Sequence, residues 1–260
     1  MNFFVIGNDK RSVKLKELYL IEGSIAEDII DSDAIICPIP FSKDRKYLLD
    51  TDILIEDYIK RYKDKILFTG AIPNEIKNRL LEENIKFYDL MELERVAILN
   101  AIPTAEGAMQ KAMEYMDITL FGSNALVLGY GRIGKILAKV LSAMGVNVFC
   151  EARNEKDLAL IKAMGYNEIN LKELDRYLLS FDVIFNTIPY MVLYSDRLDK
   201  LKKTCVVIDL ASNPGGTDFQ YASDVGLRAS LELALPSRVA PTSAAIYIKE
   251  AIDNIVNNKK

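Results

Sequence analysis

The fold class of this 260-residue chain is decided by the segment Asn124-Ala125-Leu126-Val127-Leu128-Gly129-Tyr130-Gly131-Arg132-Ile133-Gly134. An apolar run, predicted as a strand, leads into a turn of the form Gly-x-Gly-x-x-Gly, and a helical apolar pattern follows. A second apolar strand is predicted from Val146. This strand–turn–helix–strand context is typical of the βαβ unit of a Rossmann dinucleotide-binding domain.

The three glycines of this turn have different predicted roles. Gly129 permits the tight turn, Gly131 lets the backbone approach a pyrophosphate, and Gly134 lets the helix pack closely on the strand. The phosphates then meet the helix N-terminus, where unbonded N–H groups and the helix dipole favour anions. We therefore expect a dinucleotide here, the alternative being a glycine-rich turn that binds no ligand.

The end of the second strand indicates which dinucleotide binds. Ala152 is expected at the strand tip, where an acidic residue would bind the ribose 2′-hydroxyl of NAD. Arg153 beside it can contact the 2′-phosphate of NADP through two parallel hydrogen bonds. NADP is therefore favoured, and NAD stays possible because Glu151 is also nearby. Alternatively, Arg153 is a solvated arginine at a helix start and Glu151 is a surface residue that faces away.

Two polar segments follow later strands of the same predicted sheet. They are Asn186-Thr187-Ile188-Pro189 and Asp209-Leu210-Ala211-Ser212-Asn213-Pro214-Gly215-Gly216-Thr217-Asp218. Ligands of such sheets bind at the carboxyl ends of the strands, so we expect both segments near the nicotinamide. The second segment could instead be a turn into a helix capped by Thr217 or Asp218. The predicted cofactor contacts are Gly129, Tyr130, Gly131, Arg132, Ile133, Gly134, Ala152, Arg153, Asn154, Thr187, Ile188, Pro189, Leu210 and Ala211.

Strand and helix patterns alternate along the whole chain, which predicts two α/β domains with parallel sheets, the second a doubly wound Rossmann domain. The first domain is expected at 1–99, and a linker helix with the Rossmann domain at 100–241. A C-terminal helix, 242–260, is expected to begin after Pro241 with Thr242 or Ser243 as its N-cap, and to cross back to the first domain. Pro103 predicts a break over 100–104, with a helix from about Thr104 to Met116.

The individual elements are predicted from the same patterns. Strands are expected at Asn2–Ile6, Ala34–Cys37, Ile66–Thr69, Ile85–Tyr88, Ala125–Leu128, Val146–Cys150, Val183–Asn186 and Cys205–Leu210. Helices of the second domain are expected to begin near Gly131, Asn154, Leu171 and Leu193.

The composition excludes several classes of function. A net charge of -4 gives no electrostatic case for binding nucleic acid or an anionic membrane. No apolar run approaches the roughly 18 residues that span a bilayer, and the N-terminus does not have the pattern of a signal peptide, so we expect a cytoplasmic protein. The three cysteines lie in apolar segments and are interpreted as buried thiols. The chain has no histidine, which excludes an imidazole base and a histidine-based metal site, and no metal is expected.

Segments between residues 100 and 248 resemble the A-type subunit of the dipicolinate synthase family. The most specific is Asp209-Leu-Ala-Ser-Asn-Pro-Gly-Gly-Thr-Asp-Phe-Gln-Tyr-Ala222, and others lie at 100–107, 122–123, 128–134, 152–153, 186–193, 235–236 and 239–241. The segment Gly7-Asn8-Asp9-Lys10-Arg11 is similar to the family's Gly-x-Asp-x-Arg opening. Ser237 departs from the family's usual glycine after Leu-Pro, which puts the local loop geometry in doubt.

This resemblance implies an NADP-dependent oxidation of dihydrodipicolinate, derived from 4-hydroxy-tetrahydrodipicolinate, to pyridine-2,6-dicarboxylate. It also implies an oligomer, a flavoprotein-like B-type dipicolinate synthase subunit as partner, and the mother cell of a sporulating bacterium as the location. Because the product is aromatic, the oxidation needs only a modest base or water. The absence of histidine therefore does not argue against it.

A substrate with two carboxylates needs cationic or N–H partners. The candidate cations are Arg11, Arg132 and Arg238, each of which could instead form a surface salt bridge. The other candidate donors are Thr104, Ser212, Asn213, Gly216, Thr217 and Thr242. The candidate bases are Glu106, Asp209 and Asp218, with Glu106 preferred.

Two other functions stay open at this point. One is an NADP-dependent oxidoreductase of the shikimate dehydrogenase type, for which Lys43 and Lys65 are available but lie in no matching motif. The other is a regulatory module that senses a dinucleotide without turning it over.

Overall fold

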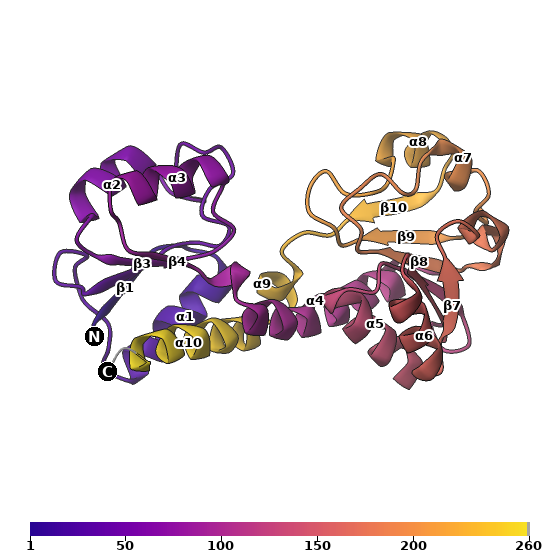
Figure 1. Ribbon diagram of the computed structural model, residues 1–260, viewed down its shortest axis with the longest axis horizontal. Coiled ribbons are helices and arrows are strands. Elements are labelled where there is room, and N and C mark those ends of the chain that lie inside the picture. Colours follow the sequence, from indigo (N-terminus) through magenta and orange to yellow (C-terminus); the bar gives the residue numbers. More distant parts are fainter. Residues whose placement is uncertain (259–260) are drawn as a thin grey trace. The chain divides into compact units, whose positions relative to one another are not determined.

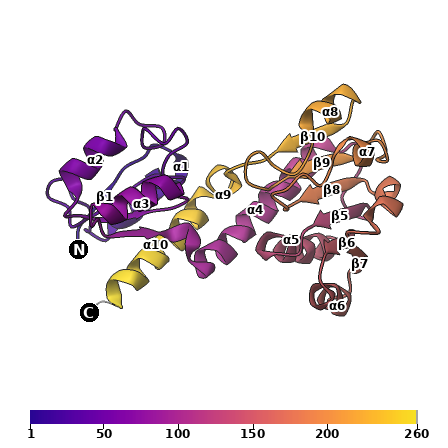
Figure 2. The same ribbon diagram turned by 45° about the horizontal axis from the view of Figure 1, so that its top comes forward.

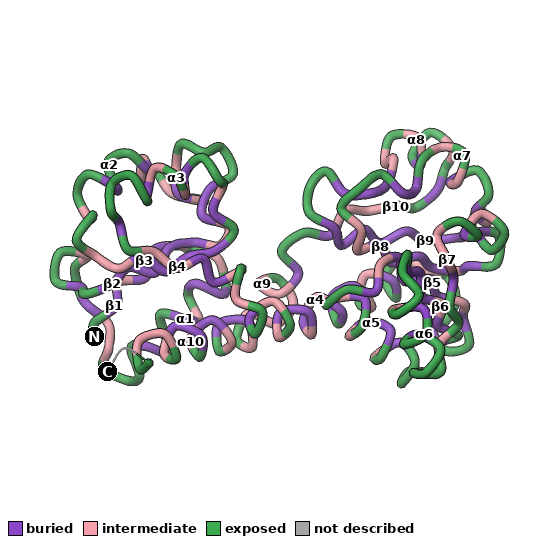
Figure 3. The backbone as a smooth tube through the Cα atoms, in the orientation of Figure 1, coloured by how far each residue is buried: buried purple, intermediate pink, exposed green. Residues whose placement is uncertain are grey.

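The computed structural model describes residues 1–258, which divide into two compact units. Unit 1 comprises Met1–Asn100 and the residues from Pro236 onward, and unit 2 comprises Ala101–Leu235. Figure 1 labels most elements of both units, and Figure 3 shows that the strands of each unit consist largely of buried residues.

Unit 1 is built on a parallel sheet with the strand order β1-β2-β3-β4. Its elements are β1 (Phe3–Val5), α1 (Lys10–Ile21), β2 (Ala34–Ile36), α2 (Ile55–Tyr62), β3 (Ile66–Thr69), α3 (Asn74–Glu82), β4 (Phe87–Asp89), the 3-10 helix η1 (Leu90–Glu92), the start of α4 (Glu94–Tyr115), α9 (Leu235–Val239) and α10 (Pro241–Asn257). Helices α1 and α10 cover one face of the sheet, and α2 and α3 cover the other (Figure 1).

In the sheet of unit 1, the chain that follows β1 passes first along one side of this strand and then, as β2, along its other side. After α1 it returns along the outer side of β1, where Ile25 and Phe3 form a single parallel bridge. The N–H of Phe3 donates to the carbonyl of Ser24 at 2.9 Å, and the N–H of Ala26 donates to the carbonyl of Phe3 at 2.9 Å. β1 therefore has neighbours on both sides, and the junction of β1 with β2 is the topological switch point of this sheet.

The C-terminal helix α10 packs within unit 1, as predicted. Its buried Ala245, Ile248 and Ile252 share a core with Phe3 of β1 and Tyr19 of α1. The predicted N-cap was wrong. The helix begins at Pro241 with Ala240 as its N-cap, because a proline at the first helical position lacks an N–H that would have no helical partner there.

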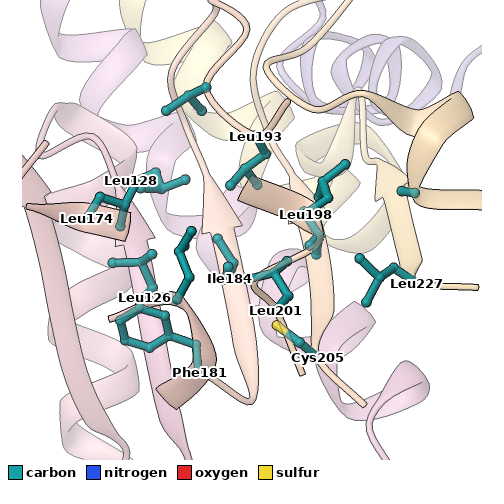
Figure 4. Close-up of a cluster of buried hydrophobic side chains, with 14 of the residues drawn as sticks. Leu126, Leu128, Leu174, Phe181, Ile184, Leu193, Leu198, Leu201, Cys205 and Leu227 are labelled. Carbon is teal, nitrogen blue, oxygen red and sulfur yellow. The ribbon is translucent and has the colours of Figure 1, made fainter. Parts of the chain in front are cut away.

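Unit 2 is a doubly wound sheet of six parallel strands in the order β10-β9-β8-β5-β6-β7, which confirms the predicted Rossmann fold (Figure 2). Its elements, after the remainder of α4, are β5 (Asn124–Leu128), α5 (Arg132–Ala143), β6 (Asn147–Ala152), α6 (Glu155–Ala163), β7 (Asn167–Asn170), the 3-10 helices η2 (Leu174–Arg176) and η3 (Leu178–Ser180), β8 (Val183–Asn186), α7 (Ser195–Leu198), β9 (Val206–Asp209), α8 (Phe219–Asp224) and β10 (Arg228–Leu231). One of its cores lies on the face of the sheet that carries Leu126, Ile184 and Phe181 (Figure 4).

Helix α4 corrects the predicted break at Pro103. The helix runs through the proline without interruption. Ala101, Ala105, Ala108 and Ala112 lie at helical spacing and are at most 1% exposed, so a continuous buried stripe favours the helix over the proline's cost of about 3 kcal/mol.

The sequence pattern did not predict the two outer strands of unit 2. β7 and β10 are four-residue edge strands in which at least half of the residues are polar, so neither has the apolar signal of a buried strand. The helix expected near Leu171 is a pair of 3-10 helices, η2 and η3, and the one expected near Leu193 begins at Ser195.

Candidate dinucleotide-binding site

The glycine turn between β5 and α5 has two glycines that the protein itself requires. Gly129 has a φ of +88°, and a Cβ there would lie 2.6 Å from Oγ1 of Thr187. A Cβ on Gly134 would lie 2.0 Å from the carbonyl oxygen of Gly129, so a side chain would force the helix away from the turn. These contacts confirm the tight turn and the close helix packing that the motif predicts.

Gly131 differs from its two neighbours in the motif. It is exposed, its φ of −83° suits any residue, and a Cβ there would meet no atom of the protein within 4 Å. Gly131 is also the N-cap of α5, with no side chain that caps the helix. The position beside Gly131, at the N-terminus of this twelve-residue helix, is therefore open, and the backbone of 131–134 would hold the pyrophosphate of a dinucleotide there.

The tip of β6 has the residues that the sequence placed there. Ala152 ends the strand and is buried, and Arg153 is exposed beside it. Asn154 is the N-cap of α6, because its Oδ1 accepts from the N–H of Asp157 at 2.8 Å. Of the two polar residues after the strand, Arg153 is therefore the one that can reach a ligand.

Glu151 is not a surface residue, so that interpretation was wrong. Its side chain is 1% exposed, and Oε2 accepts from the N–H of Gly129 at 3.1 Å. Burial raises the pKa of Glu151, although the N–H of Gly129 and the charges of Arg153 and Arg197 partly oppose that shift. Glu151 thus supports the glycine turn from within the sheet.

The segment after β8 is fixed to the glycine turn. Oγ1 of Thr187 donates to the carbonyl of Leu128 at 2.9 Å. The side chain of Asn186 accepts from the N–H of Ile188 and donates to its carbonyl, both at 3.0 Å, while Pro189 is exposed. Asn186 is fully buried and was missed as a positioning residue; its signal was a polar side chain at the end of an otherwise apolar strand.

The loop after β9 is organised by Asp209, which has no exposed surface. Oδ1 accepts from the N–H of Ala211 at 3.0 Å, and Oδ2 accepts from the N–H of Gly216 at 2.9 Å and from Oγ1 of Thr217 at 2.7 Å. Both oxygens of Asp209 are therefore occupied, and the N–H of Gly216 and the hydroxyl of Thr217 are used within the loop. In this structure Asp209 holds the loop, and the predicted roles of these three residues toward a substrate stay predictions.

The remaining residues of this loop divide into engaged and exposed ones. Asp218 caps α8 by accepting from the N–H of Tyr221 at 3.0 Å, so the alternative of a turn into a capped helix is correct. The N–H of Leu210 donates to the carbonyl of Asn186 at 2.8 Å and ties the two loops together. Ser212 and Asn213 are exposed.

The other predicted site residues lie on helices of the two units or, for Tyr130, in the glycine turn. In unit 2, Glu106 is exposed and Thr104 is half-buried on α4, Arg132 is exposed, and Tyr130 and Ile133 are buried or half-buried beside the glycines. In unit 1, Arg238 and Thr242 are exposed. Their roles stay predictions.

Arg11 of unit 1 is buried, unlike the other candidate arginines. It is 7% exposed, and Nη2 donates to the carbonyl of Ile39 at 2.6 Å. Desolvation lowers the pKa of this guanidinium, and the charge of Asp9 opposes the shift. Arg11 lies in the first turn of α1, at the carboxyl end of β1, which is one side of the switch point of this sheet.

Two absences in the described part of the chain bear on other functions. Within residues 1–258, none of the helices is both long and apolar enough to cross a bilayer. The same residues contain no group of three or more histidine, cysteine, aspartate or glutamate side chains placed to hold a metal ion. The three cysteines are buried and unpaired, and burial raises the pKa of each thiol to about 12.

The sheet order and the open glycine turn define a nicotinamide-dinucleotide-binding domain of the dehydrogenase type. In agreement, residues 90–214 match the family described as D-isomer specific 2-hydroxyacid dehydrogenase, NAD binding domain. The chain is also 35% identical over 205 residues to the A-type subunit of dipicolinate synthase from Bacillus subtilis (strain 168), covering 78% of this chain and 69% of that protein.

Two solved structures extend the similarity to nearly the whole chain. The A-type dipicolinate synthase subunit from Bacillus halodurans is 29% identical with a TM-score of 0.88, covering 98% of this chain and 97% of that one. Its counterpart from Bacillus subtilis is 28% identical with a TM-score of 0.87, covering 99% and 96%. The chain belongs to the family of A-type dipicolinate synthase subunits, as the resemblance of its motifs predicted.

Proposed function

We propose that this chain oxidises dihydrodipicolinate, formed from 4-hydroxy-tetrahydrodipicolinate, to pyridine-2,6-dicarboxylate with NADP as the acceptor. The observation that carries the proposal is the open space at Gly131, at the N-terminus of α5, in a chain of this family. The position of Arg153 at the end of β6, beside the small Ala152, supports NADP over NAD.

The reaction removes one hydride and one proton from the substrate ring. A bound nicotinamide would supply the acceptor for the hydride that leaves a ring carbon. The proton leaves a neighbouring ring atom, and Glu106, which is exposed on α4, is the proposed acceptor, with water as the alternative. Asp209 is not proposed, because three hydrogen bonds already occupy its oxygens.

The rest of the proposal concerns orientation of the substrate. Arg11, Arg132 and Arg238 are proposed to bind its two carboxylates, and Thr104, Ser212, Asn213 and Thr242 to donate further hydrogen bonds. We also propose that the chain acts in the cytoplasm of the sporulating mother cell, as an oligomer with the flavoprotein-like B-type subunit.

A coupled assay tests this function. The purified chain, alone and mixed with the B-type subunit, is given NADP⁺ and freshly generated 4-hydroxy-tetrahydrodipicolinate, and NADPH and pyridine absorbance are followed together. We expect both signals to grow at the same rate, with Gly131→Val as the inactive control. NADPH binding without any pyridine product, whether or not the B-type subunit is present, would contradict the catalytic proposal and favour a dinucleotide sensor.

A further inference from the structure

Glu151 is a buried carboxyl group directly beside the proposed pyrophosphate site. In the sheet it is in register with Leu128 of β5 on one side and Ile169 of β7 on the other. Both neighbours belong to the apolar core on this face of the sheet, in which Figure 4 shows Leu128. The side chain therefore ends an apolar row and is 1% exposed.

The two oxygens of this carboxyl group have different surroundings. Oε2 accepts from the N–H of Gly129, the first glycine of the turn, at 3.1 Å. Within residues 1–258, Oε1 is buried and has no hydrogen-bond partner. A single neutral donor is poor compensation for a buried charge, because an ionised group loses far more solvation on burial than a neutral one.

The charged groups around Glu151 do not supply that compensation. Arg197 of α7 acts on it through space, but its Nε donates to Asp175 of η2 at 2.7 Å and its Nη1 donates to the carbonyl of Val192 at 2.9 Å. Arg153, two residues along the chain, is exposed to solvent. Neither arginine donates a hydrogen bond to the carboxyl group.

We propose that Glu151 is a positioning residue of the dinucleotide site that holds the glycine turn in its neutral, protonated form, so that dinucleotide binding is coupled to protonation of this side chain. The inference rests on the proposed binding of a dinucleotide at Gly131. A pyrophosphate bound there brings two negative charges close to Gly129, and an ionised carboxylate behind that N–H would repel them. The bound anion therefore favours the neutral form of Glu151.

The sign of the pH effect follows from this coupling. Burial already raises the pKa of Glu151 in the free protein, and a bound pyrophosphate raises it further. Affinity is then highest at pH values below the pKa of the free protein. It falls as the pH rises through the interval between the free and bound pKa values, by at most about tenfold per pH unit for one proton.

Glu151→Gln tests the coupling, because an amide keeps the shape and the acceptor oxygen for Gly129 but does not titrate. The dissociation constants of NADPH and NADH are measured by nicotinamide fluorescence between pH 5 and 8.5 for the wild type, Glu151→Gln and Glu151→Ala. We expect the wild type to lose roughly tenfold more affinity than Glu151→Gln across the coupled interval. Glu151→Ala should bind more weakly than Glu151→Gln at every pH, because the N–H of Gly129 loses its acceptor. The 2′-phosphate of NADPH titrates equally with each variant, so it cancels in the comparison.

Glu168→Gln is the matched control, since it removes an exposed carboxylate from β7, the strand next to β6, and should leave the pH profile of binding unchanged. If Glu151→Gln does not fold, calorimetry of the wild type in buffers of different ionisation enthalpy measures the same coupling as proton uptake on binding. Parallel pH profiles of the wild type and Glu151→Gln, or binding without proton uptake, would overturn the inference while leaving the dinucleotide site intact. Absence of binding by the wild type to both dinucleotides would instead contradict the proposed function.

Discussion

The turn after β5 and the loop after β9 both lie at the carboxyl edge of the unit 2 sheet, yet their backbone N–H groups have different partners. The loop after β9 closes on Asp209, which accepts from Ala211, Gly216 and Thr217. The turn after β5 instead leads to Gly131, where a side chain would meet nothing. The donors of Ala211, Gly216 and Thr217 are thus not available to a ligand, because a buried acceptor already uses them. The glycine turn has fewer such donors, and we propose it as the dinucleotide site because the N-terminus of its helix is open at Gly131.

Of the variants that test this difference between the two segments, Gly131→Val should have the largest effect, which is a loss of affinity for NADPH. A valine fits the backbone at φ −83° and meets no protein atom at its Cβ, so the thermal midpoint should change little. The side chain would fill the space of the pyrophosphate, and we expect the affinity for NADPH to fall by roughly a thousandfold, about 4 kcal/mol. Fluorescence titration and thermal unfolding measure the two effects.

Gly134→Ala is the counterpart of that variant. Its Cβ would lie 2.0 Å from the carbonyl of Gly129, so it should lower the thermal midpoint as well as the affinity. If Gly131→Val retains wild-type affinity, the dinucleotide does not bind at this turn.

Asp209→Asn should lower the free energy of unfolding without removing a contact to a ligand. One carboxylate oxygen would become an NH₂ group, which would oppose either Ala211 or the pair of donors from Gly216 and Thr217. We expect the free energy of unfolding to fall by about 2–4 kcal/mol, measured by urea denaturation. A variant with wild-type stability and no turnover would restore Asp209 as a candidate base.

Arg153→Ala should weaken the binding of NADPH much more than the binding of NADH. The exposed guanidinium at the end of β6 is proposed to bind only the 2′-phosphate. Its loss should weaken NADPH by roughly 10- to 100-fold and NADH by less than twofold, since hydrogen bonds to charged groups contribute about 1.5–3 kcal/mol. Equal losses for both dinucleotides, in parallel titrations, would remove this role from Arg153.

Asp175→Asn should have the smallest effect and is the exposed counterpart of Asp209→Asn. The carboxylate of Asp175 forms ion pairs with Nε of Arg197 and with Nζ of Lys200, both at 2.7 Å. Its side chain is 38% exposed. The bond from Lys200, followed by that from Arg197, lowers the pKa of Asp175. Its contribution is therefore present above the unfolded pKa and is lost as the pH falls through the folded pKa.

We expect Asp175→Asn to cost less than about 1 kcal/mol at pH 7 and still less at about pH 2, because the contribution of Asp175 is lost as the pH falls through its folded pKa. Urea denaturation at both pH values measures this. A loss at pH 7 as large as that of Asp209→Asn would show that burial does not explain the role of Asp209.

Much of the fold could be predicted because its signals are local. The buried strands β5, β6, β8 and β9 are largely apolar runs, and the glycine motif stands between a strand pattern and a helix pattern, a context typical of a Rossmann turn. The edge strands β7 and β10 and the path of α4 through Pro103 depend on packing partners far along the chain, so they were missed.

The same distinction between local signals and contacts with distant residues holds for the candidate site. The roles of Gly129 and Gly134 are local and were predicted correctly. The engagement of Asp209 and the burial of Glu151 depend on which face of a strand each side chain occupies and on what returns to meet it. A polar residue at the end of an apolar strand could therefore be recognised from the sequence, but whether it faces a ligand or its own loop could not.

The most direct test of this account is amide hydrogen exchange with and without NADPH, resolved to single residues by NMR. In the free protein, the amides of Ala211 and Gly216 should already be protected by Asp209, and NADPH should change them little. The amides over 131–134 should exchange rapidly in the free protein and slow by at least roughly tenfold when NADPH binds. New protection at Ala211 and Gly216 with none over 131–134 would contradict the account, because it would place the dinucleotide on the loop after β9.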